Sequence, residues 1–138
     1  MKPVDQTLFA PAVYDGVHFG NCVAACIASI LEIAISEVPH SPYMHDENRL
    51  CWLESMGWVM SWDYEGSAEF ERKGYCIITG VSPREQVRHD VSFPLNHAVV
   101  GLDGMMVFDP HPSREGLALD KNAMPIVNKI YWLKKKSG

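Results

Sequence analysis

Hydrophobic and small residues fill almost every position of residues 22–34, and this pattern predicts a helix that is buried on nearly all sides. Asn21 stands directly before this run, and asparagine is one of the residue types that cap the start of a helix. Residues 45–56 show the spacing of a second, amphipathic helix, and Gly57 is a typical residue at which a helix ends. The first half of the chain is therefore predicted to be mainly helical.

The second half of the chain has short hydrophobic runs with the period of strands. Residues 65–72 are expected to form a short polar helix between two of these runs, and residues 82–95 are expected to form a loop. Helices followed by strands are typical of an α+β fold, so we predict one domain, residues 1–138, in which the N-terminal helix packs on a C-terminal antiparallel β-sheet. The predicted strands are Trp58–Trp62, Gly74–Thr79, His97–Leu102, Met105–Asp109 and Lys129–Leu133.

Composition and charge narrow the classes of function. Hydrophobic residues make up 47% of the 138 residues and charged residues 21%, which is the composition of a globular protein. The net charge of −5 argues against a nucleic-acid partner, because nucleic-acid-binding proteins carry a basic surface. No run is long and apolar enough to span a membrane, and the N-terminus lacks the apolar core of a signal peptide. We therefore expect a cytoplasmic protein with no membrane partner.

The chain has four cysteines, and in a reducing cytoplasm we expect all of them to be free thiols. Cys26, Cys51 and Cys76 lie inside apolar patterns and are expected to be buried as small hydrophobic residues. Cys22 differs because it lies where the first helix begins. Both a helix N-terminus and a nearby protonated histidine lower the pKa of a thiol, so this position favours a reactive cysteine.

A histidine and an aspartate follow Cys22 in the chain. His97 opens one apolar strand, and Asp109 closes the next strand before a proline. A thiol, an imidazole and a carboxylate can act as a nucleophile, its base and the group that orients the base. Each residue alone has an ordinary structural interpretation: a buried cysteine, a polar strand end and a turn-forming Asp-Pro pair. The combination is what indicates a catalytic site.

The turn between the two strands decides whether His97 and Asp109 can meet. A two-residue turn at Asp103 and Gly104 would pair position 97 with position 110 and place His97 and Asp109 on opposite faces. A three-residue loop, with Gly104 in the left-handed conformation and a bulge, would place them on the same face. We predict the three-residue loop, because it lets Asp109 hold the ring of His97.

These residues resemble the papain-like cysteine peptidase superfamily, most closely its small bacterial branch that includes the bacteriocin-processing (double-glycine) peptidases of ABC exporters. The resemblance covers residues 1–30 and 95–112 by motif. It implies a papain-like fold in which Cys22 is the nucleophile, His97 the general base and acid, and Asp109 the orienting residue. The motifs are Gly20-Asn21-Cys22-Val23-Ala24-Ala25-Cys26, His97-Ala98-Val99-Val100 and Phe108-Asp109-Pro110.

The resemblance also implies an oxyanion hole. Its members carry a glutamine shortly before the cysteine, and the side-chain amide of this glutamine donates to the oxyanion. Gln6 is the only glutamine before Cys22, so it is the candidate, with the segment between them looping out. The backbone N–H of Cys22 would be the second donor, because the first amides of a helix have no partner within the helix.

Substrate contacts are expected from residues beside the catalytic ones. Asn21 precedes Cys22, and Asn96 precedes His97. His111 and Arg114 lie in a loop after Asp109 that two prolines make rigid, and an arginine there suits a carboxylate or a phosphate. A rigid surface loop without contact to substrate is the alternative for this segment.

We therefore expect a thiol-dependent hydrolase that cleaves a peptide, isopeptide or other amide bond through a covalent acyl-enzyme. Its partner would be a peptide or protein substrate, it would need no cofactor and no metal, and it would be a monomer or a weak dimer. Transfer of the acyl group to an amine would use the same residues. A catalytically inactive papain-like module that binds a peptide or protein partner is the alternative. The six histidines and four cysteines are also residue types that bind metals, so a metal site is a further alternative, but they lack the close spacing of zinc ligands.

Overall fold

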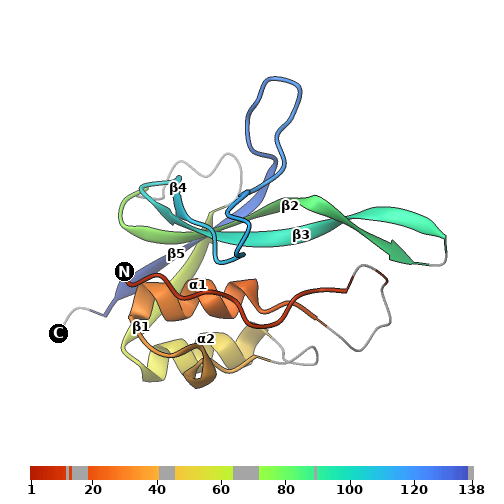
Figure 1. Cartoon of the computed structure of the whole chain (residues 1–138). Helices are drawn as coiled ribbons and strands as arrows, with labels where there is room; N and C mark the ends of the chain where they lie inside the picture. Colours follow the sequence, from red (N-terminus) through yellow and green to blue (C-terminus); the bar gives the residue numbers. More distant parts are fainter. Residues whose placement is uncertain (12, 14–18, 41–45, 64–71, 89, 137–138) are drawn as a thin grey trace.

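The structure is a computed structural model of residues 1–138, and it describes all of them except 12, 14–18, 41–45, 64–71, 89 and 137–138. The described residues form two α-helices, one short 3₁₀ helix and five strands (Figure 1). In chain order these are α1 (Cys22–Leu31), η1 (Ile35–Glu37), α2 (Asp46–Ser55), β1 (Trp58–Asp63), β2 (Tyr75–Arg88), β3 (Val91–Leu102), β4 (Met105–Phe108) and β5 (Val127–Lys135).

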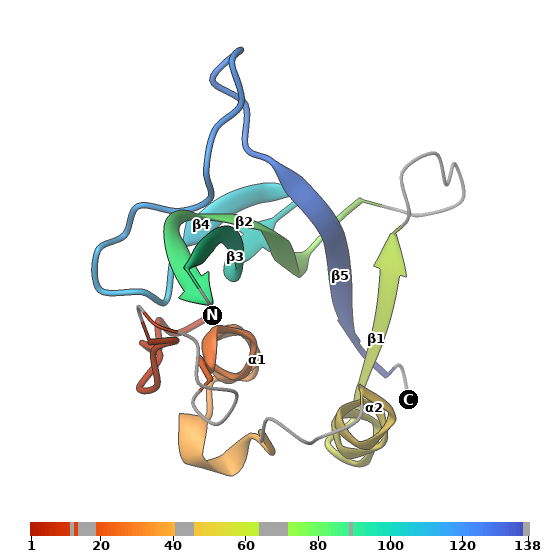
Figure 2. The same cartoon turned by 90° about the vertical axis from the view of Figure 1, so that its right-hand side faces the viewer.

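The fold is α+β, as predicted. The strands form one antiparallel sheet in the order β1-β5-β2-β3-β4. Both helices lie on the same side of this sheet, with α1 below β2 and β3 and α2 below β1 (Figure 2). The long loop before β5 rises on the opposite side (Figure 1). Cys22 and His97 therefore belong to two different layers, the helix and the sheet.

The helix α1 is the centre of the main core. Its residues from Ala24 to Ile30 are all buried, which confirms the prediction of a buried helix. Small residues let it lie close to the sheet, and Ala28 of α1 belongs to the same hydrophobic cluster as Ala98 of β3. The helix ends at Leu31, three positions before the predicted end, because the next residue, Glu32, takes a left-handed conformation with φ 60°.

The prediction of a loop at residues 82–95 was wrong. These residues continue β2 and β3 into a long hairpin that projects from the body of the molecule (Figure 1). The sequence does not show the alternation of apolar and polar positions that is typical of a strand, because the segment contains Pro83, Pro94 and many polar residues. The sheet accommodates Pro83 within a bulge between Val81 and Glu85, which is a position where strands tolerate proline.

Two further predictions concern the burial of Cys51 and the helix at residues 65–72. Cys51 was predicted to be buried but is exposed, because it lies on a solvent-facing side of α2. The predicted helix at residues 65–72 falls almost wholly outside the described residues, and Arg72, its last residue, is not helical. No helix in the described part of the chain is long and apolar enough to cross a membrane.

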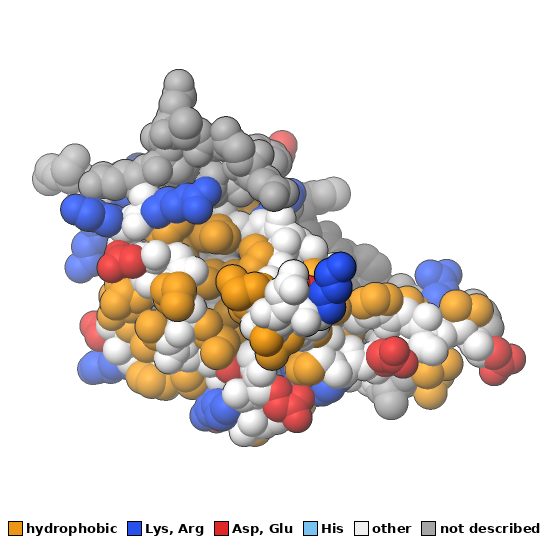
Figure 3. Space-filling view, turned by 90° about the horizontal axis from the view of Figure 1, so that it is seen from above, with side chains coloured by type: hydrophobic (Ala, Val, Ile, Leu, Met, Phe, Trp, Pro, Cys, Tyr) orange, Lys and Arg blue, Asp and Glu red, His pale blue; other side chains and the backbone are white. Residues whose placement is uncertain are grey.

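The face of the sheet that points away from α1 is partly apolar. In Figure 3, which looks down on this face, hydrophobic side chains gather over the body of the molecule and charged side chains lie mainly toward its margin. Large hydrophobic residues of the loop before β5 are exposed, among them Leu119 and Met124.

Candidate active site

Cys22, His97 and Asp109 meet at the N-terminal end of α1. Nε2 of His97 lies 2.7 Å from Oδ1 of Asp109 and donates a hydrogen bond to it. The side chain of Cys22 lies close enough to His97 to raise the pKa of its imidazole. Because Nε2 is occupied by the aspartate, Nδ1 is the ring nitrogen that remains to exchange a proton with the thiol. The thiol, the imidazole and the carboxylate thus follow one another in space, and the imidazole is hydrogen-bonded to the carboxylate.

The carboxylate of Asp109 is buried and held by three donors. Besides His97, the backbone N–H of His111 donates to Oδ1 at 2.9 Å, and that of Gly116 donates to Oδ2 at 2.7 Å. Burial alone would raise the pKa of Asp109, but these hydrogen bonds outweigh it and lower the pKa below its usual value. Asp109 therefore stays ionised and can stabilise a positive charge on His97.

The imidazole of His97 is held in its charged form. Burial lowers the pKa of this histidine, but the hydrogen bonds and charges of Asp109 and Cys22 raise it, with a net increase from 6.5 to about 9. An imidazolium next to a thiol stabilises the thiolate, which is the nucleophilic form of cysteine. The site therefore holds a protonated imidazole next to the side chain of Cys22.

The turn that brings His97 and Asp109 together differs from the one predicted. It is a two-residue turn, because Leu102 pairs with Met105, and both Asp103 and Gly104 have positive φ. A bulge then shifts the register of β4 by one residue after Met106. This shift of one residue reverses the face of the sheet to which the following residues of the chain point. The side chains of His97 and Asp109 therefore still lie on the same face. The contact was predicted correctly, but the loop has two residues instead of three, and the bulge lies within the paired strands and not at the loop.

The N-terminal segment places Gln6 beside the thiol. Its side chain is buried, it lines the same pocket as Cys22, and its Nε2 donates to the backbone oxygen of Leu8 at 3.0 Å. This leaves the second N–H of Nε2 for another acceptor. Cys22 is the first residue of α1, and the first intrahelical bond runs from Ala25 to Asn21, so the N–H of Cys22 has no partner within the helix.

Asn21 fixes this segment and is not placed to contact substrate. Its Oδ1 accepts hydrogen bonds from the backbone N–H groups of Thr7 and Leu8 at 3.0 and 2.9 Å, and its Nδ2 donates to Oγ1 of Thr7 at 2.9 Å. It occupies the N-cap position of α1, as predicted, but its side chain makes no capping bond to the helix. Asn21 thereby connects Gln6 to the start of the helix.

A pocket of about 330 Å³ opens over Cys22 and His97. Of the four predicted substrate contacts, Asn96 and His111 line it, and so does Arg84 from the bulge in β2. The ring of His111 lies edge-on to the rings of both Phe9 and His97. Phe9 was not singled out by the sequence, because no motif marks it. The pocket is bounded by the N-terminal segment on one side and by the sheet on the other.

Arg114 serves the structure of the loop. Its Nη1 donates to Oδ1 of Asp5 at 2.5 Å and to the backbone oxygen of Asp109 at 2.6 Å, and its guanidinium stacks 4.8 Å from the ring centre of Phe108. It does not line the pocket around Cys22. The predicted carboxylate-binding arginine thus ties the N-terminal segment to the Asp109 loop.

The other cysteines lack such surroundings. Cys26 is fully buried, and burial raises the pKa of its thiol well above the usual value. Burial likewise raises the pKa of Cys76 to about 11. The described residues contain no group of three or more His, Cys, Asp and Glu side chains arranged to hold a metal ion. Among the thiols, only Cys22 is seen beside a histidine in the part of the chain that the structure describes.

Comparison with known proteins does not assign the chain to a family. No protein-family model matches the chain, and neither the curated proteins nor the solved structures give a match. The class that the fold and the site define is therefore an α+β protein with a cysteine at a helix N-terminus, next to a histidine that is hydrogen-bonded to an aspartate.

Proposed function

We propose that the protein is a thiol-dependent hydrolase of papain-like type that cleaves an amide bond in a peptide or protein. The observation that carries the proposal is the arrangement of the three residues: Cys22 and His97 line one pocket, and His97 is hydrogen-bonded to Asp109. The buried amide of Gln6, which lines the same pocket as Cys22 and His97, supports it. The order helix cysteine, strand histidine and aspartate, with the helix packed on an antiparallel sheet, supports the papain-like interpretation.

In the first half of the reaction, the thiolate of Cys22 attacks the carbonyl carbon of the amide and forms a C–S bond. The negative charge that develops on the carbonyl oxygen is stabilised by the N–H of Cys22 and the amide of Gln6. His97 then gives its proton to the leaving nitrogen as the C–N bond breaks. The products of this half are an amine and a thioester on Cys22.

In the second half, His97 is neutral and accepts a proton from a water molecule. The resulting hydroxide attacks the thioester, the C–S bond breaks, and a carboxylic acid is released with Cys22 again as thiolate beside protonated His97. Asp109 keeps the imidazole oriented and stabilises its positive charge in both halves. An amine in place of water would give acyl transfer by the same steps.

The exposed Cys51 allows an internal control in a direct test of the nucleophile. Alkylation by iodoacetamide is followed at each thiol by peptide mass spectrometry as a function of pH, in the wild type and in His97→Ala. We expect Cys22 to react about tenfold faster than Cys51 below pH 7, although Cys51 is more exposed, because only Cys22 is paired with an imidazolium. His97→Ala should slow Cys22 and leave Cys51 unchanged.

Two outcomes of this experiment would contradict the proposal. If Cys22 reacts like Cys51 in the wild type, or if His97→Ala leaves its rate unchanged, the ion pair is absent and the hydrolase proposal is wrong. A module that binds a peptide or protein without cleaving it would then be the better interpretation. Cys22→Ala should abolish hydrolysis of any amide substrate with little loss of stability, whereas Cys26→Ala should mainly affect packing.

A further inference from the structure

A second pocket lies on the other side of the start of α1. It has a volume of about 240 Å³ and is enclosed by α1, α2, β1, β2 and β5. Val23, the residue after Cys22, and Thr79 of β2 are part of its wall. The two pockets have no lining residue in common, so this one is separate from the pocket over Cys22.

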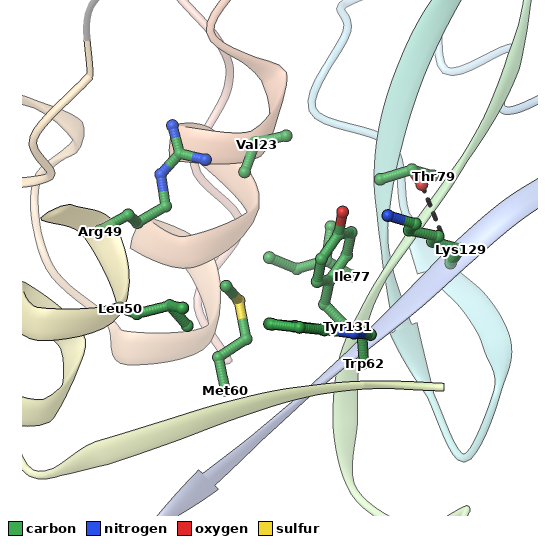
Figure 4. Close-up of a pocket in the computed structure, with 9 residues that line it drawn as sticks. All are labelled: Val23, Arg49, Leu50, Met60, Trp62, Ile77, Thr79, Lys129 and Tyr131. Carbon is green, nitrogen blue, oxygen red and sulfur yellow. Dashed lines mark hydrogen bonds between the residues drawn. The ribbon is translucent and has the colours of Figure 1, made fainter. Parts of the chain in front are cut away.

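The wall of this second pocket is apolar and aromatic. Leu50 and Met60 supply aliphatic surface, and Trp62 and Tyr131 supply two rings whose centres are 6.5 Å apart (Figure 4). A wall of this kind binds an apolar or aromatic group of a small ligand, because most ligand pockets combine such surface with a few polar groups.

The charged groups of the pocket are both cationic. Arg49 of α2 and Lys129 of β5 lie on opposite sides of it, and the ring of Tyr131 lies between them (Figure 4). Nε of Arg49 is shielded from solvent and has no hydrogen-bond partner among the described residues. No described Asp or Glu lines the pocket. Arg49 therefore offers a shielded donor next to the apolar surface of the pocket.

We propose that this second pocket binds an aromatic or aliphatic group that carries a carboxylate. The apolar part contacts Trp62, Tyr131 and the aliphatic wall, and the carboxylate accepts hydrogen bonds from Arg49. A donor such as the buried Nε of Arg49 loses free energy when it is unpaired, and a carboxylate restores the missing bond. This binding does not depend on catalysis by Cys22.

The test uses 3-phenylpropionate as the probe, with its neutral amide as the matched ligand. Binding is followed by calorimetry and by ¹⁵N NMR of the full chain. We expect the acid to shift the indole N–H signal of Trp62 and not that of Trp132, which is buried in the cluster on the other face of the sheet. The acid should bind about tenfold more tightly than the amide.

Two variants of equal charge change separate a specific contact from a general effect. Arg49→Gln should weaken binding of 3-phenylpropionate about tenfold and abolish its preference over the amide. Lys121→Gln removes one positive charge from an exposed turn in the loop before β5 and should leave binding unchanged. The proposal is overturned if the acid does not shift Trp62, if acid and amide bind equally, or if the two variants behave alike.

Two sources would provide this chemistry, the C-terminus of a peptide and a free carboxylic acid. N-acetylglycyl-phenylalanine tests the first, and 3-phenylpropionate represents the second. Tighter binding of the peptide acid supports the pocket as a site for a peptide C-terminus, and tighter binding of 3-phenylpropionate supports a small carboxylic acid. Both binding measurements are made with Cys22→Ala as well as with the wild type. Their outcome therefore does not depend on hydrolysis by Cys22.

Discussion

At the scale of single residues, the raised pKa of His97 links the charge of the site to the stability of the fold. The pKa is 6.5 in an ordinary histidine and about 9 in the folded protein, so the folded state binds the proton more tightly than the unfolded state. The resulting stability is fully present below pH 6.5 and is lost as pH rises through about 9. Its full size is on the order of 3 kcal/mol, since one pKa unit corresponds to about 1.4 kcal/mol.

We therefore predict that the free energy of unfolding falls between pH 6.5 and 9 in the wild type and stays nearly constant over this range in His97→Gln. Urea unfolding followed by circular dichroism at several pH values measures this. His111→Gln is the matched control, because burial and the charge of Arg84 lower the pKa of His111, and its effect on stability is confined to pH below 6.5. An equal slope in wild type and His97→Gln would contradict the prediction.

At the scale of elements, the N-terminal segment depends on α1 for its position. Asn21 binds Thr7 and Leu8 near Gln6, whereas Ser29 accepts a hydrogen bond from the backbone N–H of Val4 at the far end of the helix. Both side chains are buried. We predict that Asn21→Ala and Ser29→Ala each cost about 1–3 kcal/mol, because each leaves partly buried backbone N–H groups without a partner.

The two variants should differ in function. Asn21→Ala frees the segment beside Gln6 and should lower the turnover of an amide substrate about tenfold or more, comparable to the loss of one oxyanion donor. Ser29→Ala frees the segment away from Gln6 and should leave turnover close to that of the wild type. Comparing kcat with the free energy of unfolding for both variants separates positioning from stability. Equal turnover in the two would show that Asn21 does not position Gln6.

The elements also show how much of the molecule the sequence could predict. The Asn21–Cys22 helix start was predictable, because small apolar residues follow a capping residue. The hairpin beyond Val81 was not, because its fold depends on pairing between β2 and β3 that overrides two prolines. Because β4 contains a bulge, a two-residue turn gives the predicted contact between His97 and Asp109. The local sequence does not distinguish this arrangement from a three-residue loop. The structural role of Arg114 depends on Asp5, 109 residues away, which no local pattern encodes.

At the scale of the whole molecule, the candidate site joins two layers, because Cys22 belongs to α1 and His97 to the sheet. The spacing of the layers depends on small residues between them. Ala28 of α1 and Ala98 of β3 are both fully buried in the main cluster. A larger side chain there has no free space, so it must move the helix away from the sheet.

We predict that Ala28→Leu destabilises the fold by about 1–3 kcal/mol through overpacking. It should also slow the alkylation of Cys22 toward the rate of Cys51, because separating the layers increases the distance between Cys22 and His97. Leu117→Ala is the matched control, since Leu117 is buried in the cluster that includes Trp132, and losing it costs about 2–5 kcal/mol without touching the α1 interface. Leu117→Ala should leave Cys22 as reactive as in the wild type. If both variants slow Cys22 in proportion to their loss of stability, the reactivity of the thiol follows overall stability and does not depend on the spacing of the two layers.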